Sequence, residues 1–78
     1  MEIEVQIIQA IAEHLGLSSE DLESGALLRE DLGLGPIELN DLISNLSQKF
    51  NVSFESDEIK NLKKLSDLIV LVEDNLID

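Results

Sequence analysis

The sequence predicts an all-α fold, a bundle of three main helices and one short helix in a single domain spanning residues 1–78. Apolar residues recur at spacings of three and four, which is the period of an amphipathic helix. Leu, Ile and Val are abundant while the only aromatic residues are two Phe, a composition that favours helix-on-helix packing. Four Gly and one Pro are too few for the many tight turns of an all-β chain.

The first helix is expected over residues 3–15 and should end at Gly16, a residue suited to a C-terminal cap. Its apolar stripe comprises Ile3, Ile7, Ile8, Ile11, Ala12 and Leu15. Residues 17–35 form a long connection, in which Ser18 followed by Asp21 predicts one short helical turn. Leucines should pin this connection to the bundle: Leu17, Leu22, Leu27, Leu28 and Leu32.

The second helix should run from Pro36 to about Phe50. Proline suits the first helical position, because no backbone N–H is needed there, and Gly35 is an acceptable N-cap. This alone is a purely structural explanation of Pro36. The inward stripe of the helix comprises Leu39, Leu42, Ile43, Leu46 and Phe50.

Two shorter helices are expected after a connector anchored by Val52 and Phe54. The first should cover residues 57–62 with Ser56 as its cap, and its acidic first turn suits the helix dipole. The last helix should open at Ser66 and Asp67 and run to about residue 76. Its inward residues are Leu68, Ile69, Val72 and Leu76, with Leu65 packing just before it.

The charge balance restricts the partners of the chain. Seventeen acids against five bases give a formal net charge of −12, which repels nucleic acid and anionic lipid surfaces. The same field attracts proteins with basic docking surfaces, although it also serves simply to keep a small protein in solution. Lys60, Lys63 and Lys64 form a basic cluster, which we interpret as a solvated face rather than a docking patch.

Catalysis and metal binding are not expected. His14 is the single histidine, and no convincing acid/base pair or nucleophilic triad accompanies it. There is no Cys, and the acids do not follow a calcium-loop pattern. Residues 1–4 lack the basic region of a signal peptide, and the longest apolar run, residues 68–72, is too short to span a membrane. A cytoplasmic monomer is the expectation.

The stretch that carries most functional information is Asp31-Leu32-Gly33-Leu34-Gly35-Pro36-Ile37-Glu38-Leu39. It resembles the motif of acyl carrier proteins, which runs Asp-Leu-Gly-x-Asp-Ser-Leu-[Asp/Glu]. The resemblance covers nearly the whole chain, since the helix order is also that of the family, with Phe50 where its second helix usually ends. It implies an acyl-carrier-like bundle.

Three departures separate the chain from that pattern. Pro36 stands where the family has the Ser that carries 4'-phosphopantetheine, and proline has no hydroxyl to esterify. Gly35 stands where the family has Asp. The resemblance also implies an acidic recognition face along the second helix, but only Glu38 and Asp41 remain, because Ser44, Ser47 and Gln48 follow.

Three functions are open at this point. The first is a non-carrying interaction partner of acyl-transfer enzymes in fatty-acid or polyketide-type synthesis, with no cofactor, docking onto basic surfaces of those enzymes. Its partner-binding residues would be Leu34, Gly35, Pro36, Ile37, Glu38, Leu39 and Asp41. The second is a true carrier, with phosphopantetheine attached at a non-standard Ser. The third is an unrelated small acidic regulatory binding module.

Overall fold

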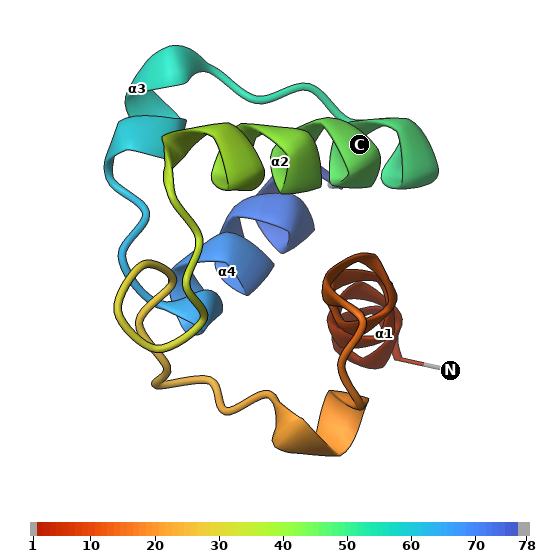
Figure 1. The fold of residues 1–78 in the computed structure, drawn as a ribbon. Coiled ribbons are helices and arrows are strands. Elements are labelled where there is room, and N and C mark those ends of the chain that lie inside the picture. Colours follow the sequence, from red (N-terminus) through yellow and green to blue (C-terminus); the bar gives the residue numbers. More distant parts are fainter. Residues whose placement is uncertain (1, 77–78) are drawn as a thin grey trace.

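The computed structural model describes residues 2–76 and contains the helices expected from the sequence (Figure 1). They are α1 (Ile3–Leu15), a 3-10 turn η1 (Ser19–Asp21), α2 (Pro36–Phe50), α3 (Ser56–Lys60) and α4 (Leu65–Asn75). The prediction of three main helices and one short helix is therefore confirmed, as is the helical turn after Ser18. The predicted domain spans residues 1–78, and of these residues 1, 77 and 78 lie outside the range that the structure describes.

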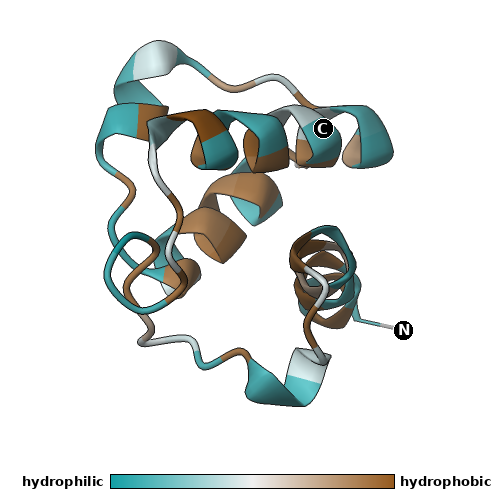
Figure 2. Ribbon diagram, viewed as in Figure 1, coloured by the Kyte–Doolittle hydropathy of each residue, from teal (hydrophilic) through white to brown (hydrophobic). Residues whose placement is uncertain are grey.

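The core lies where α1, α2 and α4 meet. In Figure 1, α4 lies below α2 and beside α1, and α3 sits beside the N-terminal end of α2. Figure 2 shows the apolar residues of the three long helices turned toward the space between them. The largest fully buried side chains are Ile7, Ile11, Leu42, Leu46, Leu65, Leu68 and Val72. Burying these aliphatic groups together is the main favourable term in the stability of the bundle.

The apolar stripe predicted for α1 is right for most of its length and wrong at its first residue. Ile7 and Ile11 are completely buried, whereas Ile3, the first residue of the helix, is 38% exposed. Ala10, which the predicted stripe omitted, is buried. The helix ends as expected at Gly16, which adopts φ 71° and ψ 29°, a left-handed conformation that costs glycine little.

Backbone hydrogen bonds hold the long connection against the start of α4. The Leu28 N–H donates to the Lys63 carbonyl at 2.9 Å, and the Leu65 N–H donates to the Ala26 carbonyl at 2.9 Å. Leu28 is buried in the core, as predicted. Leu17 is 43% exposed, so its predicted anchoring role is wrong, because the chain leaves α1 there along the surface.

Acidic side chains set the starts of the two C-terminal helices earlier than predicted. The Glu55 N–H donates to Glu58 Oε1 at 3.0 Å, which makes Glu55 rather than Ser56 the N-cap of α3. The Lys64 N–H donates to Asp67 Oδ2 at 3.0 Å, so α4 begins at residue 65 rather than at Ser66. The short helix also ends earlier, at residue 60 rather than 62.

Asp67 should make the stability of the chain depend on pH. Hydrogen bonds from the N–H groups of Lys64 and Lys63 lower the pKa of this carboxyl below its ordinary value. The stabilisation is complete above the unfolded-state pKa and is lost as pH falls through the folded value. We expect Asp67→Asn to destabilise the chain at pH 7, by an amount that shrinks below about pH 4.

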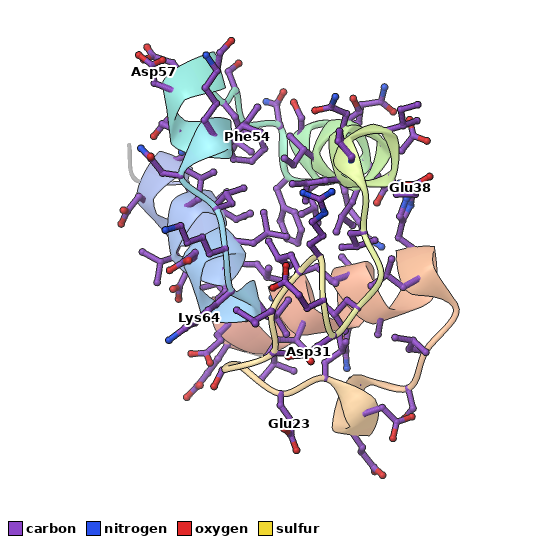
Figure 3. The ribbon with its side chains drawn as sticks, turned by 60° about the vertical axis from the view of Figure 1, so that its left-hand side comes forward. Glu23, Asp31, Glu38, Phe54, Asp57 and Lys64 are labelled. Atoms are coloured by element: carbon purple, nitrogen blue, oxygen red, sulfur yellow. The ribbon has the colours of Figure 1, made fainter. Side chains whose placement is uncertain are left out.

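Chemical denaturation of both proteins across pH 2–8 measures this difference. Glu23→Gln, at an exposed loop acid that points outward in Figure 3, is the control, with little change expected at any pH. A difference for Asp67→Asn that stays constant down to the acid limit would contradict the assigned role.

Within residues 2–76, no helix combines the length and apolar character needed to cross a membrane.

Candidate functional site

The junction between the long connection and α2 has the geometry that proline requires. Gly35 is the N-cap, with φ −76° and ψ 179°, and Pro36 is the first helical residue. The Gly35 carbonyl accepts the Leu39 N–H at 2.9 Å, which begins the helical hydrogen-bond series. Pro36 is exposed and loses no intrahelical hydrogen bond at this position.

The Asp-Leu-Gly element builds the turn that presents this junction. Asp31 Oδ2 accepts the Leu27 N–H at 2.8 Å, and the Leu34 N–H donates to the Leu28 carbonyl at 2.9 Å. Gly33 has φ 69°, a left-handed conformation that favours glycine. In Figure 3, Asp31 lies in this loop, whereas Glu38 belongs to the neighbouring end of α2. Asp31 and Gly33 thus have structural roles that do not require a prosthetic group.

The residues predicted to bind partners divide into an exposed set and a supporting set. Ile37 is 72% exposed, and Glu38 and Asp41 are exposed within a helical turn of it. Leu34 is only 6% exposed and half-buried Leu39 packs against the core. We name the exposed set, Pro36, Ile37, Glu38 and Asp41, the α2 start surface. It combines an apolar centre with two carboxylates.

Glu38 occupies the space where the family motif has a side chain at residue 35. A Cβ added to Gly35 would lie 2.6 Å from Glu38 Oε1, which is the far end of a flexible side chain. The Gly35 backbone itself is in an ordinary extended conformation that any residue can adopt. An Asp at residue 35 therefore needs only a rotation of Glu38.

The serines of the chain lie away from the junction along the sequence. No Ser occurs between residues 25 and 43. Ser44 is exposed further along α2, and the half-buried Ser47 hydroxyl donates to the Val52 carbonyl, where it helps to close the end of the helix. The nearest serines in sequence, Ser24 and Ser44, are thus 12 and 8 residues from Pro36 (36 − 24 and 44 − 36).

An open pocket of about 470 Å³ adjoins the junction, between the connection, the first turn of α2 and α3. Gly35 and Pro36 form part of its wall. Its apolar surface comprises Leu27, Leu28, Leu34, Leu39, Ile59 and Leu62. Its basic residues are Arg29, Lys60 and Lys63. The two lysines were expected to form a solvated face, and Arg29 was not among the predicted site residues, because the pocket forms only when the loop pairs with residues 63–65.

Other candidate chemical groups are not gathered into a site. His14 is exposed in the last turn of α1. Across residues 2–76, no cluster of three His, Cys, Asp or Glu side chains has the arrangement to hold a metal ion.

Comparison with known proteins agrees with the fold and the motif. Residues 5–72 match the family model described as "Phosphopantetheine attachment site". The chain is 32% identical to an acyl carrier protein of Exiguobacterium sibiricum over 72 residues, covering 92% of this chain and 91% of the relative. It is 29% identical to an acyl carrier protein of Nitratidesulfovibrio vulgaris, covering 94% and 96%.

A solved structure gives the same result in three dimensions. The crystal structure of an acyl carrier protein from Thermotoga maritima superimposes with a TM-score of 0.76 at 26% sequence identity. The superposition covers 92% of this chain and 84% of the other.

Proposed function

The chain belongs to the acyl carrier protein family, and we propose that within this family it is a non-carrying interaction partner of acyl-transfer enzymes. The observation that carries the proposal is Pro36. It stands at the family's attachment position and opens α2, and it has no hydroxyl that could form a phosphodiester. We assign the protein no catalytic step of its own.

Two features support the absence of phosphopantetheine at residues other than Pro36. No Ser lies between residues 25 and 43, so no hydroxyl is available within several residues of the loop–helix junction on either side. Ser47 uses its hydroxyl to bond the Val52 carbonyl, which gives that residue a structural role. The alternative, a true carrier modified at another Ser, would be revealed by modification of the purified chain with a broad-specificity phosphopantetheinyl transferase and coenzyme A.

The α2 start surface supports a role in docking. Exposed Ile37 supplies apolar contact area, and the carboxylates of Glu38 and Asp41 complement basic residues on a partner. The overall charge of −12 adds long-range attraction to a basic enzyme surface. The acids therefore set encounter and orientation, while the isoleucine contributes the desolvated contact.

Competition for an acyl-transfer enzyme tests this docking role. The chain should inhibit transfer from that enzyme to the phosphopantetheine-loaded acyl carrier protein of the same organism. Glu38→Lys/Asp41→Lys should weaken the inhibition by about tenfold, because two attractive contacts become repulsive. Glu20→Lys/Glu23→Lys, which changes the net charge equally at exposed residues beyond α1, is the matched control and should retain most of the inhibition.

Equal loss of inhibition in both double variants would mean that only net charge matters and would contradict a defined docking surface. Absence of inhibition by the unaltered chain across the acyl-transfer enzymes of its host would instead favour an acidic regulatory binding role outside acyl transfer; the family match already overturns the alternative of a module unrelated to acyl carrier proteins.

A further inference from the structure

An open groove lies between α3 and α4, and we name it the α3–α4 groove. Its volume is about 370 Å³, and its walls come from α3, the linker after it and α4. The helix α2, which the structure describes in full, contributes no residue to it. In Figure 3, α3 and α4 lie on the left of the molecule and Glu38 lies on the right. The groove is therefore separate from the α2 start surface.

Val70 gives this groove an exposed apolar side chain. It is 51% exposed, whereas Ile69 and Leu71 beside it are buried, because the inward face of α4 already supplies the core. A single exposed apolar residue is ordinary on a protein surface. Val70, however, lines the same groove as half-buried Leu62 and the edge of Leu71, so the three form an apolar surface that water covers at present.

The charged residues that line the groove are all acids. They are Glu58, Asp67 and Asp74, and no Lys, Arg or His among the described residues joins them. The nearby bases Lys60 and Lys63 line the pocket beside the start of α2 instead. The groove thus combines an apolar surface with negative charge, which is complementary to an apolar group flanked by bases.

Asp74 stands where its own helix disfavours a carboxylate. Glu73 and Asp74 lie near the end of α4, whose last turn holds no base. The carbonyl groups at a helix C-terminus carry partial negative charge, so acids there are destabilising and cations are favourable. Within residues 2–76, the Asp74 carboxylate forms no hydrogen bond or ion pair. A cation supplied from outside the chain would relieve this repulsion.

The spacing of the groove residues on α4 matches the period of a second helix. Asp67, Val70 and Asp74 are three and four residues apart, so they form one stripe along α4. The two aspartates are separated by about 10 Å along the axis, or two helical turns. A helix with an apolar residue between two bases at the same spacings would oppose this stripe, and an amphipathic helix in a groove is a recurrent mode of recognition.

We propose that the α3–α4 groove docks a basic amphipathic helix of a partner protein. An apolar side chain of that helix packs against Leu62 and Val70, and its Lys or Arg residues pair with Glu58 and Asp74. Asp67 contributes less, because its Oδ2 already accepts the backbone N–H groups of the two preceding lysines. A second copy of this chain does not suit the groove, since two chains of charge −12 repel each other.

This site goes beyond the proposed docking to acyl-transfer enzymes and does not depend on it. The two surfaces share no residue, so the chain can hold an enzyme at the α2 start surface and a second protein at the groove. Failure of the peptide measurement below would leave the competition assay intact, and failure of that assay would leave the groove intact.

Isothermal titration of the full chain with two synthetic helical peptides tests the proposal. The probe peptide consists of alanine, leucine and lysine, with its leucines on one face of the helix and lysines on both sides of them. The comparison peptide has the same composition, with the leucines and lysines distributed evenly around the helix. We expect the probe to bind about tenfold more tightly, because only it presents an apolar strip between bases.

The variant Val70→Ser/Asp74→Asn should bind the probe about tenfold more weakly, since it loses an apolar contact and an ion pair. Val5→Ser/Glu4→Gln is the matched control, because it makes the same kind of change at an exposed valine and a neighbouring acid of α1. It should retain the affinity of the unaltered chain. All four side chains are exposed, and circular dichroism shows that both variants are folded.

Four results would overturn the proposal. These are equal affinity for the two peptides, equal loss of binding in the two variants, no binding of the probe at millimolar concentration, and a dimer of the chain in sedimentation that Val70→Ser/Asp74→Asn abolishes. The last result would assign the groove to a second copy.

Amide chemical shifts locate the bound probe. Changes should concentrate at Leu62, Val70 and Leu71. Changes centred on Ile37 would place the probe on the α2 start surface instead and would also contradict the proposal.

Discussion

Replacing Pro36 with Ser together with Gly35 with Asp is expected to convert an unmodified chain into a substrate of a tolerant phosphopantetheinyl transferase. The structure accommodates both changes. Residue 36 is exposed at the first helical position, and residue 35 has an ordinary extended backbone. The new Asp displaces only the end of the Glu38 side chain, whose Oε1 lies 2.6 Å from the added Cβ position.

The mass of the chain after incubation with coenzyme A and the transferase measures the outcome. The single variant Pro36→Ser should be modified less completely, since it supplies the hydroxyl without the neighbouring carboxylate of the family motif. Gly35→Asp alone is the matched control and should remain unmodified. If the double variant also stays unmodified, more than these two residues separates the chain from a carrier, and the recognition surface itself differs.

Leu42→Ala should cause a large loss of stability. Leu42 is 0% exposed and lies in the core formed by α1, α2 and α4. Removing a buried leucine side chain costs about 2–5 kcal/mol, through lost transfer free energy and the cavity left behind. For a domain of 78 residues this is a large share of the total, so the variant should be partly or wholly unfolded at 37 °C.

Urea denaturation followed by circular dichroism measures the change. Ile37→Ala, in the same helix but 72% exposed, is the matched control and should change the unfolding free energy by less than about 0.5 kcal/mol. Comparable losses for Leu42→Ala and Ile37→Ala would contradict the assignment of the inward face of α2.

The long helices were predictable because their local and tertiary signals agree. In α2 the proline start, the apolar spacing and the Phe50 end all indicate the same element, and its bounds are those expected. The predicted starts of α3 and α4 were each one residue too late, because the carboxylate of the third helical residue, Glu58 or Asp67, selects the cap. Ser56 and Ser66 resembled caps, but the hydrogen bonds that decide the boundary form only when the helix is folded.

The candidate site was predictable only where it depends on consecutive residues. The consecutive residues from Asp31 to Glu38 predict the loop–helix junction. In the structure, Asp31 accepts a hydrogen bond within the loop, Gly35 is the N-cap and Pro36 begins α2. The pocket beside it requires Arg29 and Lys60 to come together over 31 residues of chain (60 − 29), through the pairing of Leu28 with Lys63. Periodicity within helices carries no information on such a contact.

The mass of the intact protein purified from its native host tests the central claim most directly. An unesterified proline at the start of α2 predicts the mass calculated from the sequence, with no phosphopantetheine increment in any fraction. A species heavier by one phosphopantetheine group, located on any Ser by fragmentation, would contradict that account and establish the chain as a carrier of acyl groups.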